Sequence, residues 1–308
     1  MTSTVQPAGT VATEPRLNRT ARRRRGTAEA APAHWTVKAA VIIICFFWIV
    51  PAFGTLVTSF RNELDANNSG WWTVFNPANW GGFTFSNYHD AIVNAQLGQA
   101  FINSFAIALP ATFIPLLIAA FAAYAFTFMQ FPGRNVMFLV IVSLLVVPNF
   151  VAMVPLLQIY GRLRIGGTFP SVWLFHLGFG MSLAIFLLRN YMATLPREVI
   201  ESASIDGASH YTTFYRLILP MSTPVLAAFA IFQFLWVWND LLVALVFLGP
   251  GENAPMTVAV KNNLIGQQGQ GWNLVTAGGI LTMVVPIILF LAMQRYFVRG
   301  LTAGSVKG

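Results

Sequence analysis

One short stretch of the sequence places an acid, two amides and a tryptophan inside an apolar segment: Gln233, Trp236, Asn239 and Asp240. In a helix with about 100° between successive residues, Gln233, Trp236 and Asp240 would lie within about 60° on one face. A carboxylate in lipid is costly, so an intramembrane acid indicates a transport path. Amide and carboxylate acceptors beside an aromatic ring also suit a sugar, which has apolar C–H faces and many hydroxyl donors. The segment is therefore a candidate substrate path.

Motifs for catalysis are missing from the sequence. It has no G-x-x-x-x-G-K-[ST] phosphate loop, so any ATP must bind another polypeptide. It has no H-E-x-x-H or G-x-S-x-G pattern, which makes an intramembrane enzyme a poor fit. Of the four histidines, His176 lies in an apolar segment, where a packed, hydrogen-bonded side chain is more common than a ligand. The single cysteine, Cys45, rules out a disulfide within the chain. We expect no catalytic residue and no metal site.

The composition indicates a membrane protein. Of the 308 residues, 56% are hydrophobic and only 9% are charged, whereas about a quarter of the residues in a soluble domain are charged. So few charges cannot cover the surface of a water-soluble globule of this length. A net charge of +8 can accompany nucleic-acid binding, but seven of the 18 Lys and Arg precede residue 39, including the run from Arg22 to Arg25. That run is more typical of a cytoplasmic tail that sets topology, so we expect no nucleic-acid partner.

The chain divides into a polar tail and an apolar remainder. Residues 1–36 are rich in Thr, Ala, Pro and Arg, which predicts a disordered, basic cytoplasmic tail. Residues 37–308 form the predicted transmembrane domain. A helix needs about 20 apolar residues to cross the bilayer. The sequence therefore predicts an all-α membrane protein with six transmembrane helices, at residues 39–60, 99–130, 136–160, 169–188, 223–248 and 274–293.

The basic residues predict the orientation. With the N-terminus inside, 14 of the 18 Lys and Arg fall on inner segments and 4 on outer ones. Cytoplasmic segments of membrane proteins are enriched in Lys and Arg. We therefore expect a multi-pass membrane protein with both termini in the cytoplasm.

The inner loop at about 194–222, between the fourth and fifth spans, carries the signals of two short helices. Pro196 followed by Glu198 indicates a helix start. Gly207 indicates its end, because glycine adopts the left-handed conformation, and Ser209 can cap a second helix. Apolar side chains then recur at helical spacing, at Tyr211, Phe214, Tyr215, Ile218 and Leu219. An interfacial connector has the same pattern, so spacing alone does not assign a function to this loop.

The residues of this loop resemble the EAA loop of binding-protein-dependent ABC importer permeases: Glu201-Ser-Ala-Ser-Ile-Asp206-Gly207-Ala208, then Leu219-Pro220. Glu201 and Gly207 occupy the hallmark positions, and Ser202 replaces the usual first alanine. The ending from Gly300 to Gly308 is similar to that of the maltose-type G subunit, and residues 232–248 resemble α-glucoside-type permeases. Other segments resemble the carbohydrate branch of the family: Asn103-Ser104, 122–126, 131–134, 185–189 and 238–240.

The resemblance implies a MetI-like permease fold, a place in the bacterial cytoplasmic (inner) membrane and a set of partners. These are a second homologous permease, a dimer of ATPase subunits, an extracytoplasmic sugar-binding protein, a sugar of disaccharide or α-glucoside type, and membrane lipid. ATP and Mg would bind the ATPase, so no cofactor is expected in this chain. In the family the EAA helix sits in a cleft of the ATPase and transmits its movement. The residues expected at that interface are Glu198, Glu201, Ser202, Ala203, Asp206, Gly207, Ala208, His210, Gly304 and Lys307.

Two alternatives stay open at this point. The chain could be an ion-coupled secondary transporter of a small polar solute, but such carriers place several acids or bases in the membrane, and Asp240 is almost alone. At the substrate path, Asp240 could instead bond to a neighbouring helix while Trp236 packs against the second permease. Against this, the other spans offer few buried partners for a carboxylate. In the maltose system the other permease makes most of the substrate contacts.

Overall fold

The computed structural model describes residues 35–265 and 271–302, with side chains to residue 294. Of the predicted tail, residues 1–34 lie outside the described residues, and helix α1 already begins at Trp35. The chain divides into two compact units, Met1–Pro51 and Ala52–Gly308. The first contributes the start of α1, an apolar helix, and the second contains every other element.

The described residues are almost entirely helical, as the sequence predicts. Among them the only strand-like pairing is an isolated bridge between Arg61 and Phe83. Short 3₁₀ or π-helical turns separate several helices, at Trp71–Phe75, Pro77–Gly82, Asp90–Asn94, Leu144–Val146, Phe214–Ile218 and Val260–Ile265. The α-helices are α1 (Trp35–Thr58), α2 (Glu63–Asn68), α3 (Ser86–His89), α4 (Leu97–Phe128), α5 (Arg134–Ser143), α6 (Asn149–Arg162), α7 (Phe169–Met192), α8 (Arg197–Ile205), α9 (His210–Thr213), α10 (Leu219–Met221), α11 (Thr223–Trp238), α12 (Leu242–Phe247), α13 (Met256–Ala259) and α14 (Trp272–Thr302).

Four described helices are long and apolar enough to cross a membrane alone: α1, α4, α7 and α14. Two further pairs meet the criterion only together. Arg134–Val146 and Asn149–Arg162 meet at a bend of 100°, and His210–Met221 and Thr223–Trp238 meet at a bend of 71°. Counting each bent pair as one span gives six, which is the predicted number.

Proline explains why the third predicted span is not one straight helix. Val147 precedes Pro148 and is extended, with φ −69° and ψ 121°, because the proline ring excludes the helical conformation from the residue before it. Pro148 has no N–H to continue the helix, and α6 begins after it. The fifth predicted span is also interrupted. Its helix α11 ends at Trp238, and α12 begins only at Leu242.

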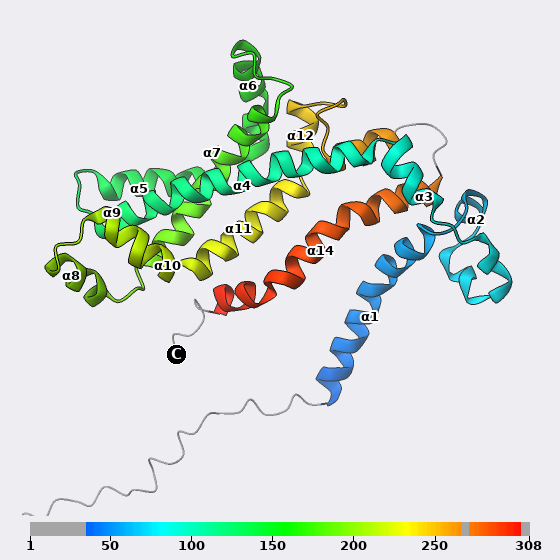
Figure 1. Cartoon of the computed structure of the whole chain (residues 1–308), viewed down its shortest axis with the longest axis horizontal. Coiled ribbons are helices and arrows are strands. Elements are labelled where there is room, and N and C mark those ends of the chain that lie inside the picture. The colour runs from blue at the N-terminus through cyan, green and yellow to red at the C-terminus, as the bar shows by residue number, and fades with distance from the viewer. Residues whose placement is uncertain (1–34, 266–270, 303–308) are drawn as a thin grey trace, which may run out of the picture. The chain divides into compact units, whose positions relative to one another are not determined.

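Helix α4 is the element around which the second unit packs, with α7 and α11 in contact along it (Figure 1). Its buried positions include Ala108, Ala111, Ala119, Ala120 and Ala123. Small side chains at these positions let neighbouring helices approach closely, which is how membrane helices gain packing energy without a hydrophobic driving force. Helix α4 is thus the axis of the second unit, with the α8–α10 loop at its C-terminal end and the 249–263 segment at its N-terminal end.

Candidate functional site

The loop between α7 and α11 has the local structure that the sequence predicts. Pro196 precedes α8, and Glu198 lies in its first turn. Gly207 ends the helix with φ +76°, in the left-handed region. Because that conformation is strained for residues with a Cβ, glycine is needed here. Ser209 Oγ accepts a hydrogen bond from the Thr212 N–H at 3.2 Å and caps α9. The helix start, the stop and the cap are therefore confirmed.

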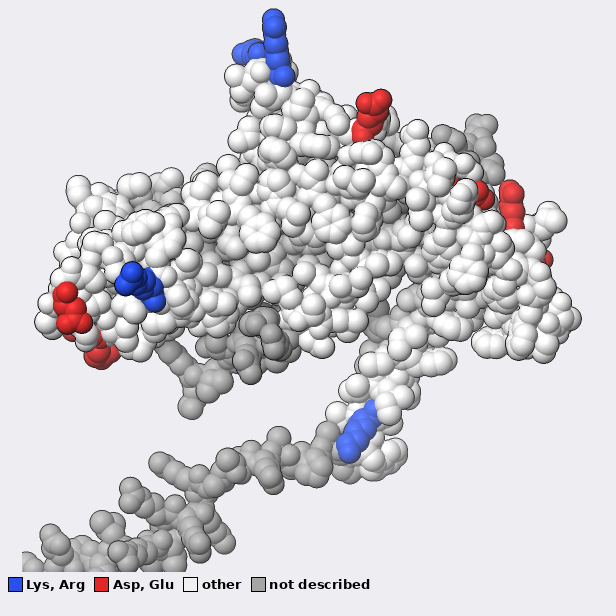
Figure 2. All heavy atoms as spheres, viewed as in Figure 1, with Lys and Arg blue, Asp and Glu red and all other residues white. Residues whose placement is uncertain are grey.

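Helix α8 presents an acidic, solvent-facing surface. Glu198, Glu201 and Asp206 are all exposed, and Figure 2 shows acidic side chains gathered at the end of the second unit that carries α8. Ile205 places an apolar side chain among them that is 86% exposed, while Ala203 is the buried residue of the helix. Acids around an exposed apolar side chain suit a partner surface with basic and apolar groups.

The other predicted interface residues fall on both sides of the turn. Ser202 is exposed on α8, but its hydroxyl donates to the Glu198 carbonyl at 2.7 Å, so it supports the helix. Ala208 is half-buried, and its N–H donates to the Ala203 carbonyl at 2.9 Å. Gly304 and Lys307 lie outside the described residues.

The segment after the turn anchors the loop to the last turns of α4. His210 Nδ1 lies 3.0 Å from the Tyr124 hydroxyl. Phe214, 3% exposed, stacks on Phe121 with 4.6 Å between ring centroids. Ile218 is fully buried in the same apolar cluster. These contacts join the acidic helix to the axis of the unit.

The apolar stripe predicted for this segment is only partly buried. Phe214 and Ile218 face the core, but Tyr211 is 69% exposed and Tyr215 is 39% exposed. Tyr211 and Tyr215 are four residues apart, as are Phe214 and Ile218, so each pair shares one face of a helix and only the second pair faces the core. The buried stripe is therefore narrower than predicted, and residues Phe214–Ile218 form a π-helical turn in place of the expected α-helix.

The candidate substrate path lies at the break between α11 and α12. Asn239 ends α11, and the Asp240 carboxylate accepts a hydrogen bond from the Val243 N–H at 3.0 Å through Oδ1, which caps α12. The Asp240 carbonyl also accepts from Thr257 Oγ1 at 2.8 Å. The expected continuous helix over 223–248 is wrong at this point, so helical spacing does not place Asp240 relative to Gln233.

Asp240 has a buried partner on another helix. His176 of α7 brings Nε2 to 3.3 Å from Asp240 Oδ2, and the two side chains are 1% and 12% exposed. One other span therefore offers Asp240 a buried partner, so the argument against a bond to a neighbouring helix does not hold. The contact matches the part of the alternative that concerns Asp240, and His176 is buried, as predicted. The packing of Trp236 against a second permease stays a prediction. His176 Nδ1 has no hydrogen-bond partner among the described residues.

Three of the four predicted path residues surround one pocket. Trp236, Asn239 and Asp240 line a cavity of about 310 Å³, to which α6 contributes Asn149 and Phe150. This volume is at the lower end of the range for small-molecule sites. Asn149 follows the helix-breaking Pro148, so a proline-terminated span is the sequence signal that could have pointed to it.

Gln233 does not reach this pocket. Its side chain is fully buried, and Nε2 donates to the Ala111 carbonyl of α4 at 3.3 Å. It fills the space over Gly180 of α7, where an added Cβ would lie only 2.6 Å from Gln233 Nε2. Gln233 therefore ties α4, α7 and α11 together in this structure.

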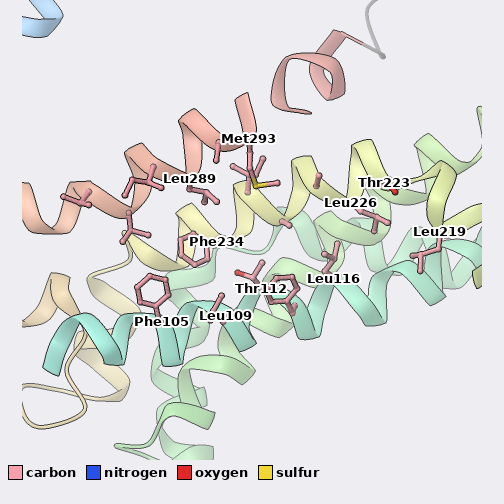
Figure 3. A pocket seen from close by; sticks show the side chains of 18 of the residues that line it. Phe105, Leu109, Thr112, Leu116, Leu219, Thr223, Leu226, Phe234, Leu289 and Met293 are labelled. Carbon is pink, nitrogen blue, oxygen red and sulfur yellow. The ribbon is translucent and has the colours of Figure 1, made fainter. Parts of the chain in front are cut away.

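A larger hollow, of about 1130 Å³, lies between α4, α11 and α14 and is almost wholly apolar (Figure 3). Side chains such as Leu109, Phe234 and Leu289 point into it from the three helices. Its polar side chains are two threonines, Thr112 and Thr223. Such a surface suits lipid or another apolar helix, and it lacks the hydrogen-bonding groups that a polyhydroxylated solute needs.

Comparisons with known proteins place this fold in a family. Residues 115–303 match the family described as "Binding-protein-dependent transport system inner membrane component". The chain is 50% identical over 270 residues to the osmoprotective compounds uptake permease protein GgtD of Synechocystis sp., which covers 87% of this chain and 90% of GgtD. It is 54% identical over 231 residues to the alpha-glucoside transport system permease protein AglG of Rhizobium meliloti, covering 73% of this chain and 61% of AglG.

The solved structures agree on the fold. A chain from the crystal structure of a bacterial ABC transporter involved in the import of the acidic polysaccharide alginate has a TM-score of 0.61, with 15% identity, over 86% of this chain and 96% of that chain. The protein described here therefore belongs to the family of binding-protein-dependent inner membrane transport components, with the MetI-like permease fold. It is a multi-pass membrane permease rather than an enzyme, because in this family ATP is hydrolysed by a separate subunit.

Proposed function

We propose that the chain is a permease subunit of an ATP-driven sugar importer whose substrate is a disaccharide or an α-glucoside. The observation that carries the proposal is the exposed acidic helix α8, ended by the left-handed Gly207 and anchored to α4 through His210 and Phe214. The names of relatives support the substrate class: AglG is named for α-glucoside transport, and the permease SugB of Mycobacterium tuberculosis, 32% identical, is named for trehalose transport.

In this proposal α8 is the helix to which an ATPase subunit binds. Glu201 pairs with a basic residue of the ATPase, and Ile205 fills an apolar contact beside it. Gly207 lets the chain turn directly under the docked helix. Gly304 and Lys307 reach the ATPase dimer from the C-terminal tail. The ATPase, and not this chain, holds ATP and Mg.

Movement of α8 reaches the substrate path along α11. The helices α9 and α10 join α8 to the start of α11, and the 16 residues of α11 extend over about 24 Å at 1.5 Å per residue. Its far end is the break that carries Asp240. Closure of the ATPases would therefore shift the pocket lined by Trp236, Asn239 and Asp240 between inward-open and outward-open states, with Gln233 keeping the three helices packed.

The proposal includes the remaining partners and the orientation. A second, homologous permease completes the path, and an extracytoplasmic sugar-binding protein delivers the sugar. Both termini and α8 lie in the cytoplasm, as the 14 basic residues on inner segments predict. The lipid bilayer covers the apolar faces of the outer helices.

Reconstitution tests the proposal. The chain, its partner permease and the ATPase are placed in proteoliposomes with the binding protein, and uptake of labelled maltose, trehalose and sucrose is measured. Uptake should require ATP and the ATPase subunit, and it should survive dissipation of the proton gradient. Uptake by this chain alone, driven by an ion gradient, would instead identify an ion-coupled carrier. The buried His176–Asp240 pair would then act as a proton relay.

A further inference from the structure

A third cavity, a pocket of about 910 Å³, lies at the N-terminal end of α4, the end opposite the α8–α10 loop. It is built mainly from the start of α4, the loop at 250–254 and the π-helical turn at Val260–Ile265. In contrast to the apolar hollow between α4, α11 and α14, its lining is rich in carboxamides: Gln96, Gln99, Asn103, Asn253, Asn262 and Asn263.

Three of these amides hold the walls in place. Asn103, 4% exposed, donates from Nδ2 to the carbonyls of Glu252 and Ala254, at 2.6 and 3.1 Å. Asn253 Nδ2 donates to the Gly167 carbonyl at 2.9 Å, and Asn263 Nδ2 donates to the Ala95 carbonyl at 2.9 Å. The pocket is therefore preformed, because hydrogen bonds fix its separate segments to one another.

The same arrangement leaves acceptors open. The amide donors of Gln99, Asn253 and Asn263 are used within the protein, but their amide oxygens accept no hydrogen bond from the described residues. Asn262 has a buried Nδ2 without a partner among these residues. A buried donor that lacks a partner is costly unless a ligand or water satisfies it.

Charge and shape narrow the ligand class. The one charged side chain in the described lining is Glu252, and the Lys261 ammonium lies 3.4 Å from Oδ1 of the lining residue Asn262. One charge of each sign at the pocket favours a neutral ligand over a charged one. No cluster of acidic, histidine or cysteine side chains suited to a metal occurs in the described residues. Phe169 adds an aromatic side chain to the lining, which suits the apolar C–H face of a sugar ring. Amide acceptors beside such a surface fit a neutral ligand with many hydroxyl donors.

We infer that this pocket binds a neutral sugar at the outer mouth of the permease, before the sugar reaches the 310 Å³ pocket at the α11–α12 break. The inference rests on the proposed function, because α8 in the cytoplasm puts this end of α4 on the outer side. The substrate then meets two sites along this chain, an amide-rich outer one and an inner one beside Asp240.

Sugar binding to the detergent-solubilised transporter complex, without the binding protein, tests the inference. Saturation-transfer NMR with maltose, trehalose and sucrose measures binding to wild type, Gln99→Leu, Asn262→Leu and the control Asn68→Leu. Asn68 is an exposed amide on α2, outside the pocket. We expect about three- to tenfold weaker binding for each pocket variant and no change for the control. Asn262→Leu should change the melting temperature little, because it removes a buried donor without a partner among the described residues and only one long, exposed contact, from Lys261 Nζ to Asn262 Oδ1 at 3.4 Å.

The outcomes separate the pocket from the proposed function. ATP-driven transport with unchanged sugar binding in both pocket variants overturns the inference and leaves the proposed function intact. If the pocket variants bind sugar more weakly but ATP does not drive transport by the complex, the sugar pocket is supported and the proposed importer function is rejected. A higher half-saturating concentration of the binding protein, with sugar binding unchanged, would identify a docking surface for that protein and would also overturn the inference. If the wild-type complex shows no saturable sugar binding, the inference is also overturned.

Discussion

His176 Nε2 lies 3.3 Å from Asp240 Oδ2, and this contact joins α7 to the break between α11 and α12. The other oxygen of Asp240 is also engaged, as the cap of α12 through the Val243 N–H. Both carboxylate oxygens of Asp240 therefore make contacts that fix the conformation of the break between α11 and α12. A substrate at the neighbouring pocket meets an acid whose orientation is already fixed, which is the kind of support that a binding site needs from its surroundings.

Changing His176 should weaken the complex more than changing Asp240 to its amide. His176→Phe leaves a buried carboxylate without its partner, which is strongly unfavourable. Asp240→Asn keeps the acceptor for Val243 and removes the charge, so assembly should largely survive. We expect a lower melting temperature for His176→Phe than for Asp240→Asn, measured on the solubilised complex. The double variant should be more stable than the sum of the single changes, by about 0.5–3 kcal/mol.

Val246→Ala is the control for these variants, because Val246 lies on α12 and is 38% exposed. Equal melting temperatures for wild type and His176→Phe would show that the pair contributes nothing to the break. Additive effects in the double variant would show that the two side chains do not interact in the membrane.

Trp236→Ala should impair transport more than assembly. Trp236 lines the inner pocket, and its ring packs edge-on against His176 at 6.0 Å between centroids. Removing the ring takes away an aromatic face that can hold a pyranose, and we expect transport per assembled complex to fall at least about tenfold. The measurement is sugar uptake divided by the amount of complex recovered. A loss that only follows lower assembly would assign Trp236 to packing.

The sequence predicted the structure correctly where a feature depends on residues that are neighbours in the chain. Pro196, Gly207 and Ser209 each act on the backbone within a few residues, so the start and end of α8 and the cap of α9 were predicted. The second predicted helix is instead divided into α9, a π-helical turn and α10. The six apolar segments likewise predicted the helical membrane fold. Pro148 explains why the third span is interrupted, but the 100° angle of the bend depends on how α6 packs.

Contacts between distant residues could not be predicted in the same way. His176 and Asp240 are 64 positions apart, and only the packing of α7 against α11 brings them together. The outer pocket could not be predicted for the same reason, because Asn103 forms hydrogen bonds to a loop that lies about 150 residues further along the chain. Gln233 was placed on the path by helical spacing, but that spacing cannot show that Gly180 leaves a space for it.

Gly207→Ala should uncouple the transporter without unfolding it. Nothing lies within 4 Å of a Cβ at this position, so the cost comes from φ +76° alone, which is about 1–2 kcal/mol for an L-residue. The turn should relax toward negative φ and tilt α8 away from its docked direction. ATPase subunits should co-purify poorly and transport should fall, while the melting temperature of the membrane domain stays close to wild type.

Gly133→Ala is the control for this variant, because Gly133 has φ +79°, similarly open surroundings and a position outside the α8–α10 loop. Full coupling in Gly207→Ala would show that the turn tolerates a side chain.

The orientation predicts which cysteines a membrane-impermeant maleimide can label in cells. In a Cys45→Ser background, a cysteine at Asn135, at the start of α5, should react only after the membrane is opened. A cysteine at Asn68, at the end of α2, should react in intact cells. Both residues are exposed, so accessibility within the fold does not limit the reaction. Labelling of Asn135→Cys from outside would reverse the topology.

Glu201→Ala should weaken ATPase docking while leaving the membrane domain assembled. Glu201 is exposed on α8 and makes no hydrogen bond or ion pair with its side chain among the described residues, so its removal costs the permease itself little. A partner interface that uses the carboxylate in a charge-assisted hydrogen bond should lose about tenfold or more in affinity. The ATPase affinity of Glu201→Gln should fall between those of wild type and Glu201→Ala, because glutamine keeps an acceptor and loses the charge.

Glu63→Ala is the control for loss of one surface charge, because Glu63 is an exposed acid on α2. The measurement is ATPase recovered with affinity-tagged permease over a salt series: the wild-type complex should weaken as salt rises, and Glu201→Ala should show a smaller salt dependence. Equal recovery and equal salt dependence in wild type and Glu201→Ala would remove this carboxylate from the interface and leave α8 as a connector.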